Sequence, residues 1–120
     1  MTDKVVVLVT CANPREAKRI ARAAVEARLA ACVNVLAAPV HSVFRWKGKV
    51  AQAREVLLLM KTSRKKLAAL RAAVECLHSY DVPEFIALPI HTGSKAYFAW
   101  LDESIAAPHA AKRKAERGGT

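Results

Sequence analysis

The chain has 120 residues, of which 53% are hydrophobic and 6% aromatic, so we expect one domain whose core is filled mainly by alanine, valine and leucine. Its formal net charge of +10, from 20 Lys and Arg against 10 Asp and Glu, favours anionic partners in general. No apolar run approaches the ~20 residues of a membrane span, and no secretory signal precedes the first strand. We therefore predict a cytoplasmic protein with reduced cysteines and no membrane association.

The positive charge is spread along predicted helix surfaces and gathered in the run Lys112–Lys114. On the first predicted helix, lysine and arginine alternate with Glu16 and Glu26, which is typical of a solvated surface. The terminal run lacks the interleaved aromatic side chains that stack on bases, so we do not expect nucleic-acid binding. These observations predict a single domain over residues 1–107, followed by a basic, disordered tail over residues 108–120.

The chain begins with a predicted strand and helix. Residues 4–10 form a β-branched apolar run, which predicts a central strand buried on both faces. Asn13 is a favourable helix cap, Pro14 suits the first helical position, and Glu16 follows the cap by three residues. The apolar stripe that follows predicts a helix to about residue 28 or 29.

A long hairpin is predicted next. Residues 32–47 and 50–62 favour extended structure and are joined by a turn at Lys47-Gly48-Lys49. Pro39 implies an edge strand, a bulge or a bend near the middle of the first arm. Arms longer than the usual five or six residues project beyond their own sheet, and their exposed edges invite pairing with another chain. The hairpin therefore predicts an oligomer.

The second half predicts a helix, a strand and a final helix. Thr62 or Ser63 is expected to cap the first of these helices, residues 85–90 form the strand, and Ser94 caps the last helix, which Pro108 ends. The resulting order is β-α-β-β-α-β plus a helix. With right-handed crossovers, this order predicts an α+β, ferredoxin-like split βαβ sandwich.

The predicted topology brings several potential metal ligands to one edge of the sheet. That edge receives Cys11, Cys76, His78 and Glu84. Cys32 and Lys61 fall at the opposite edge, so Cys32 joins the group only from a neighbouring chain. A thiol together with an imidazole suits a soft ion such as Cu(I).

Structural roles are open for the same residues. Buried cysteines often pack as small hydrophobic groups, a histidine after a helix can contact its C-terminus, and a carboxylate such as Glu84 often pairs with lysine. Trp46 suits an interface anchor as well as a ligand platform. The sequence has no CxxC or HExxH motif and no Gly-rich phosphate loop, and nothing marks an oxyanion site beside a Cys–His pair. We therefore expect neither an enzyme nor an organic cofactor.

Several motifs carry a family resemblance. They are VVVLVTCAN (5–13), ARLAACVNVL (27–36), FRWKGKV (44–50), EVLLLMKT (55–62), HSYDVPEF (78–85), ALPI (87–90) and AYFAWLDES (96–104). In these segments the chain resembles the CutA family of divalent-cation tolerance proteins. The resemblance implies a ferredoxin-like subunit in a homotrimer assembled through long hairpins, similar to PII-type signalling trimers, and binding of copper or another divalent metal ion.

The resemblance also implies site residues. Its metal ligands match Cys11, Cys32, His78 and Glu84, and a cleft between subunits matches Trp46, Lys61 and Tyr80. The chain departs from the family pattern at Phe44, Ser79 and Asp81, where the family usually has tyrosine, proline and glutamate. Two functions follow: a trimeric, cytosolic, non-enzymatic copper-binding protein of metal tolerance, or a PII-like trimer that binds an anionic metabolite in the cleft.

Overall fold

Strands and helices follow the predicted order in the computed structural model, which describes residues 2–107. The strands are β1 (Lys4–Cys11), β2 (Cys32–Val35), β3 (Val40–Trp46), β4 (Lys49–Ser63) and β5 (Ile86–Pro89). The helices are α1 (Pro14–Glu26), α2 (Leu67–Leu77) and α3 (Lys95–Ser104). This order confirms the predicted α+β, ferredoxin-like arrangement. The tail predicted over residues 108–120 lies outside the described residues.

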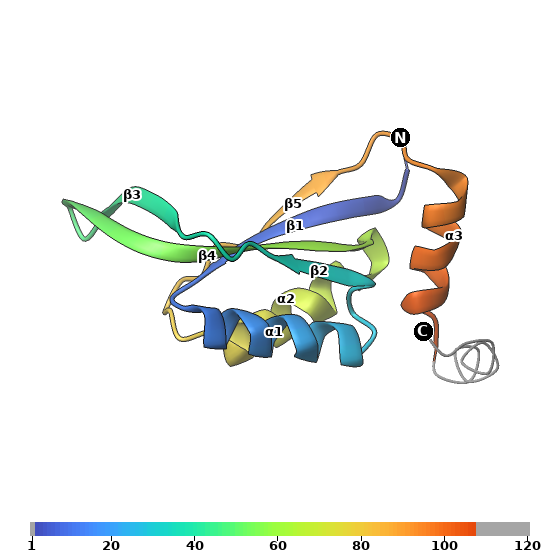
Figure 1. The fold of residues 1–120 in the computed structure, drawn as a ribbon, viewed down its shortest axis with the longest axis horizontal. Helices are drawn as coiled ribbons and strands as arrows, with labels where there is room; N and C mark the ends of the chain where they lie inside the picture. Colours follow the sequence, from blue (N-terminus) through green and yellow to red (C-terminus); the bar gives the residue numbers. More distant parts are fainter. Residues whose placement is uncertain (1, 108–120) are drawn as a thin grey trace.

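The sheet is antiparallel, with the strand order β2-β4-β1-β5. β4 is 15 residues long: its second half pairs with β1 and β2, and its first half pairs with β3 alone. The β3–β4 hairpin therefore extends well beyond the sheet, as predicted (Figure 1), and the molecule measures 51 × 30 × 25 Å. The bend expected at Pro39 separates β2 from β3.

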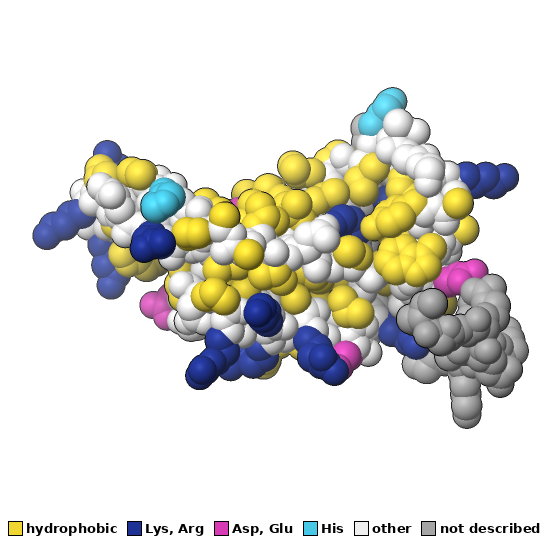
Figure 2. Space-filling view, in the orientation of Figure 1, with side chains coloured by type: hydrophobic (Ala, Val, Ile, Leu, Met, Phe, Trp, Pro, Cys, Tyr) yellow, Lys and Arg dark blue, Asp and Glu magenta, His cyan; other side chains and the backbone are white. Residues whose placement is uncertain are grey.

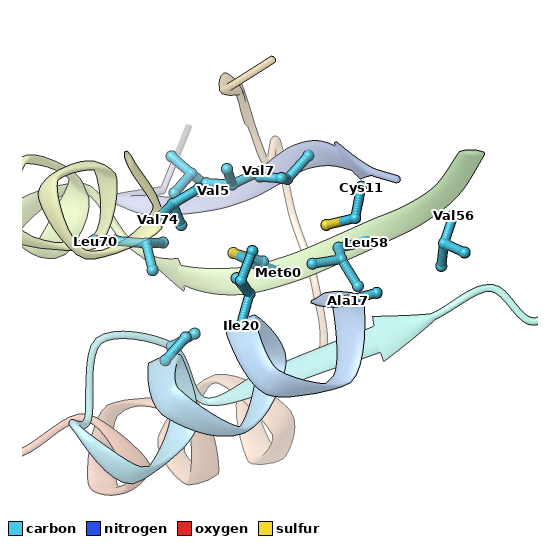
Figure 3. Close-up of a cluster of buried hydrophobic side chains, with 13 residues drawn as sticks. Val5, Val7, Cys11, Ala17, Ile20, Val56, Leu58, Met60, Leu70 and Val74 are labelled. Atoms are coloured by element: carbon cyan, nitrogen blue, oxygen red, sulfur yellow. The ribbon is translucent and has the colours of Figure 1, made fainter. Parts of the chain in front are cut away.

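The helices α1 and α2 cover one face of the sheet, and the core lies between these two layers (Figure 1). Figure 3 shows side chains of β1 and β4 facing those of the helices. The fully buried members of this core include Val7, Val9, Ile20, Leu58, Met60 and Leu70. α3 lies across one end of the sheet (Figure 1), where Asp102 meets the buried ammonium group of Lys4 at 3.1 Å.

Within residues 2–107, no helix covers the other face of the sheet. Val6 and Leu8 are only partly buried there, so the expectation that β1 is buried on both faces is wrong for the single chain. The register places Leu88 opposite Val6 and Ile86 opposite Leu8, and Ile86 and Leu88 are 47% and 46% exposed. Figure 2 shows hydrophobic side chains gathered over β1 and β5. We call this set, Val6, Leu8, Ile86 and Leu88, the open apolar face.

The predicted caps of α1 and α3 are confirmed, and that of α2 is wrong. Asn13 Oδ1 accepts a hydrogen bond from Glu16 N at 2.9 Å, and Ser94 Oγ accepts one from Tyr97 N at 3.0 Å. By contrast, the side chain of Ser63 makes no cap hydrogen bond, and α2 begins only after a 3₁₀ turn at Arg64–Lys66. Ser63 still belongs to β4, where it pairs with Lys4, and its buried hydroxyl has no hydrogen-bond partner within the described residues.

Two shorter deviations occur in the first half. α1 ends at Glu26, two residues before the predicted end, because Arg28 adopts a left-handed conformation with φ of 61°. Thr62, the other residue predicted as a cap, donates instead to the carbonyl oxygen of Leu29 at 2.7 Å. That hydrogen bond ties the chain after α1 to the end of β4.

The hairpin turn gives a first prediction. Lys47 and Gly48 have φ of 51° and 81°, as in a type I′ turn, and an added Cβ on Gly48 would meet no atom within 4 Å. Gly48→Ala should therefore lower the free energy of unfolding by about 1 kcal/mol through backbone strain alone. Lys47→Asn should raise it slightly, since asparagine tolerates positive φ. Urea denaturation of both variants measures these changes. An unfolding free energy of Gly48→Ala equal to that of the wild type would contradict the prediction.

Candidate functional site

Three buried side chains with metal-binding groups meet where β1 ends, α1 begins and α2 ends. They are Cys11, Glu16 and His78, and their potential ligand atoms all lie within 4.8 Å of one another. Cys11 is the last residue of β1, Glu16 lies in the first turn of α1, and His78 follows the last residue of α2. The structure thus brings Cys11 and His78 together, as the topology predicted, and adds a carboxylate. We call these three residues the edge cluster.

Glu16 fastens the start of α1 to the end of α2. Its Oε1 accepts a hydrogen bond from Ala12 N at 3.1 Å, and its Oε2 accepts one from Ser79 N at 2.8 Å. Burial alone would raise the pKa of Glu16, but the hydrogen bonds from Ser79 and Ala12, with a smaller contribution from His78, hold it below its usual value. The side chain is therefore an ionised, buried carboxylate at neutral pH.

The imidazole of His78 is fully buried and hydrogen-bonded through both nitrogens. Nε2 lies 2.7 Å from the carbonyl oxygen of Thr10, which can only accept, so the ring proton is assigned to Nε2. Nδ1 accepts from Tyr80 N at 3.1 Å and lies 4.0 Å from Glu16 Oε1. Nδ1 is therefore the nitrogen that faces the carboxylate.

The thiol of Cys11 is buried at the end of the core (Figure 3). Burial, followed by the negative charges of Glu16 and Glu55, raises the pKa of Cys11 to about 12. The group is consequently a protonated thiol at neutral pH, which does not suit a nucleophile. A metal ion that binds here must displace that proton.

The donor set of the edge cluster fits a transition metal. A thiolate, an imidazole and a carboxylate are the usual ligands of zinc and are compatible with copper. Donors that each lie about 2.0–2.3 Å from one ion are at most about 4.6 Å apart, close to the 4.8 Å limit within which these atoms lie. A small inward movement, with release of Tyr80 N from His78 Nδ1, would complete a three-donor site.

Glu84, Trp46 and Tyr80 line a separate cavity of about 760 Å³ at the base of the hairpin, which we call the hairpin cavity. Its full lining is Thr10, Ser42, Val43, Phe44, Trp46, Ala53, Glu55, Ser79, Tyr80, Asp81, Val82 and Glu84. The Tyr80 hydroxyl donates to Glu55 Oε2 at 2.7 Å, and the Tyr80 ring lies 4.6 Å from that of His78. The hairpin cavity therefore adjoins the edge cluster.

Cys32 and Lys61 lie at the opposite edge of the sheet. They are paired in the register of β2 and β4, and Lys61 Nζ is 3.9 Å from Cys32 Sγ. Within one chain, Cys32 does not meet Cys11, and Lys61 does not line the hairpin cavity. Both placements follow from the predicted strand directions.

Sequence reasoning missed two carboxylates, Glu16 and Glu55. The sequence places Glu16 at a capping position and on a solvated helix surface, and the second interpretation is wrong because Glu16 is only 6% exposed. A glutamate three residues after the cap reaches back towards the preceding strand end, where Cys11 lies. Glu55 stands at the start of the apolar run of β4 and is only 7% exposed. A charged residue inside a predicted buried strand is the signal that could have marked it.

Comparison with known proteins identifies the family. The model of the family described as CutA1 divalent ion tolerance protein matches residues 5–104. The chain belongs to the CutA1 family. Among relatives, the divalent-cation tolerance protein CutA of Thermus thermophilus is 46% identical over 99 residues, which are 82% of this chain and 95% of that protein. The mouse protein CutA is 45% identical over 95 residues, and this chain spans 53% of its length.

Solved CutA structures share the fold. The CutA structure from Archaeoglobus fulgidus, whose name describes it as periplasmic, has a TM-score of 0.83 and 38% identity, covering 86% of this chain and 99% of that one. CutA1 from Oryza sativa has a TM-score of 0.81 and 44% identity, covering 84% of this chain and 92% of that one. Relatives in this family are named tolerance proteins rather than enzymes. Within residues 2–107, no helix is long and apolar enough to cross a membrane.

Glu16 gives the second prediction. Glu16→Gln should lower the free energy of unfolding by about 1–3 kcal/mol, because an amide cannot accept from both Ala12 N and Ser79 N. Because the pKa of Glu16 is lowered by folding, the stability it contributes is present above its unfolded value and is lost as the pH falls through the folded value. The difference in unfolding free energy between Glu16→Gln and the wild type should therefore shrink below about pH 4.5.

The matched control is Glu26→Gln on the same helix, where the carboxylate is exposed and pairs with Arg22. That change should alter stability by less than about 0.5 kcal/mol. Denaturation curves of both variants at pH 7 and pH 3 separate the two effects. Equal stability losses in the two variants would contradict the bridging role of Glu16.

Proposed function

We propose that this CutA1-family chain is a non-enzymatic, divalent-metal-binding protein of metal tolerance and that the edge cluster holds the ion. The observation that carries the proposal is the meeting of Cys11, Glu16 and His78 ligand atoms within 4.8 Å in a buried site. The thiol and imidazole favour copper among the available ions. The raised pKa of Cys11 argues against covalent catalysis, because a catalytic thiol needs a lowered pKa.

The other predicted ligands have different places in this proposal. Glu84 lies in the neighbouring hairpin cavity, where its carboxylate would attract cations towards the edge cluster. Cys32 would contribute only from a neighbouring copy. The alternative is an anionic metabolite in a cleft between subunits. It would need Lys61 from a neighbouring copy, because the cavity within one chain is lined by Glu55, Asp81 and Glu84 and not by Lys61.

We further propose a homotrimer of the PII type, assembled through the β3–β4 hairpins in the cytoplasm. Two observations support assembly: none of the described helices covers the open apolar face, and the hairpin projects beyond the sheet. An uncovered apolar sheet face of this kind is typical of a subunit interface. Cys11, Cys32 and Cys76 form no disulfide with one another, and unpaired cysteines are usual for cytoplasmic proteins.

Metal titration tests the proposed site. In calorimetry, Cu²⁺ and Zn²⁺ should both bind the wild type, and the Cu²⁺ complex should show a thiolate-to-metal absorption band. Cys11→Ser should remove this band and weaken metal binding at least about tenfold. Cys76→Ser, which changes an exposed thiol on α2, is the control and should bind as wild type. An unaltered band and affinity in Cys11→Ser would exclude the edge cluster as the metal site.

Light scattering tests the assembly. The wild type should have the mass of three 13.1 kDa chains, which is about 39 kDa. Leu88→Glu places a charge on the open apolar face and should shift the mass towards the monomer. Ala72→Glu introduces the same charge on the exposed surface of α2 and should leave the mass unchanged. A monomeric wild type at micromolar concentration would overturn the trimer.

A further inference from the structure

The hydrogen bond from Tyr80 N to His78 Nδ1 occupies an atom that the proposed metal site needs. The two atoms are 3.1 Å apart, and Nδ1 is also the ring nitrogen that lies 4.0 Å from Glu16 Oε1. An imidazole nitrogen accepts a hydrogen bond with its single lone pair, and it binds a metal ion through that same pair. The N–H of Tyr80 and an ion therefore compete for Nδ1, and only one of them can hold it.

The other ring nitrogen of His78 offers no alternative. Nε2 lies 2.7 Å from the carbonyl oxygen of Thr10, which only accepts, so Nε2 keeps the ring proton. Histidine ligands usually donate their second ring N–H to a backbone carbonyl or a carboxylate, and this contact fixes the nitrogen that faces the ion. The contact with Thr10 therefore leaves Nδ1 as the ligand atom.

Glu16 is not subject to the same competition. Its Oε1 accepts from Ala12 N and its Oε2 accepts from Ser79 N, but a carboxylate offers about four acceptor positions on its two oxygen atoms. Either oxygen can bind an ion and keep its N–H donor. The bond that has to break is consequently the one from Tyr80, while Ser79 N stays attached to Glu16 at the start of the loop of residues 79–83, which we call the Tyr80 loop.

Few contacts hold the Tyr80 loop in place. Asp81 and Val82 make no hydrogen bond or ion pair within residues 2–107, and Val82 is 70% exposed. Tyr80 donates its N–H to His78, places its ring 4.6 Å from the ring of His78, and donates its hydroxyl to Glu55 Oε2 at 2.7 Å. Two of these three contacts are with His78, so a change at Nδ1 acts directly on the loop.

The third contact of Tyr80 opposes movement of the loop. Its hydroxyl is bound to Glu55, a residue of β4 that is only 7% exposed, and hydrogen bonds to a carboxylate are stronger than neutral ones. A backbone movement that withdraws Tyr80 N from His78 also strains this bond. The bond to Glu55 therefore favours the arrangement in which Tyr80 N–H holds Nδ1, and it lowers the affinity of the edge cluster for metal.

We propose that Tyr80 is a positioning residue that controls metal entry into the edge cluster, and that the Tyr80 loop is displaced when His78 Nδ1 binds an ion. This inference rests on the proposed metal-binding function and adds a consequence at the surface. Metal binding among buried side chains changes the position of an exposed loop, which gives the molecule two surfaces that differ with metal occupancy.

Hydrogen exchange and histidine NMR test the displacement in the wild-type protein. On addition of Zn²⁺, the amide of Tyr80 should exchange at least about tenfold faster, while the amide of Tyr97, which donates to Ser94 Oγ at the start of α3, should keep its rate. In ¹⁵N spectra, Nδ1 of His78 should take the shift of a metal-bound nitrogen, and Nε2 should keep its proton. Unchanged exchange of the Tyr80 amide, or metal bound through Nε2, would overturn the proposal.

Tyr80→Phe tests the role of the hydroxyl, because it removes the bond to Glu55 and keeps the ring and the backbone N–H. The affinity for Zn²⁺ should rise at least about fivefold, since Nδ1 is then free in a larger share of the molecules. A purely structural role predicts the opposite sign, because a loosened site binds metal more weakly. Tyr97→Phe, at the other tyrosine of the chain, is the matched control and should bind Zn²⁺ as the wild type does. Equal or weaker Zn²⁺ binding by Tyr80→Phe would show that Tyr80 does not control entry.

Cys11→Ser separates this proposal from that of the metal site. If Zn²⁺ binding to the wild type does not depend on Cys11, both proposals are wrong. If binding depends on Cys11 but the Tyr80 amide and the affinity of Tyr80→Phe do not change as stated, the control by Tyr80 is wrong and the metal site stands.

Discussion

The buried carboxylate of Glu16 is the interaction on which the edge of this molecule depends. It accepts backbone N–H groups from Ala12, after β1, and from Ser79, after α2. Both hydrogen bonds are partly buried, and hydrogen bonds to a charged acceptor are stronger than neutral ones. By accepting them, Glu16 fixes the loop that carries His78 against the end of β1. The edge cluster is therefore a consequence of helix capping as much as of any metal chemistry.

The one-sided sheet is the second constraint. Helices α1 and α2 cover one face (Figure 1), so β1 sends Val7 and Val9 into the core and leaves Val6 and Leu8 partly exposed. The same strand β4 serves the core in its second half and the hairpin in its first half. Folding of the chain and its proposed assembly therefore both depend on β4, which runs from the core into the hairpin.

The two candidate sites are adjacent but chemically distinct. The edge cluster is buried, and its donor atoms are already hydrogen-bonded or protonated. A metal ion that binds there must therefore displace a proton. The hairpin cavity is open, aromatic and acidic. Tyr80 connects them, since its ring lies against His78 and its hydroxyl binds Glu55.

Local chemistry made much of this fold predictable. The Asn13 cap, the turn at Gly48 and the break at Pro39 depend on neighbouring residues alone, and the strand order followed from the rule for right-handed crossovers. The sequence by itself thus determined the elements, their order and the shared edge of Cys11 and His78. Only the tertiary structure decided that Ser63 stays in β4, that Glu16 joins the edge cluster, and that Glu55 faces Tyr80. These outcomes depend on which strand face is covered and on hydrogen bonds between segments far apart in the chain, and neither is encoded in local residue patterns.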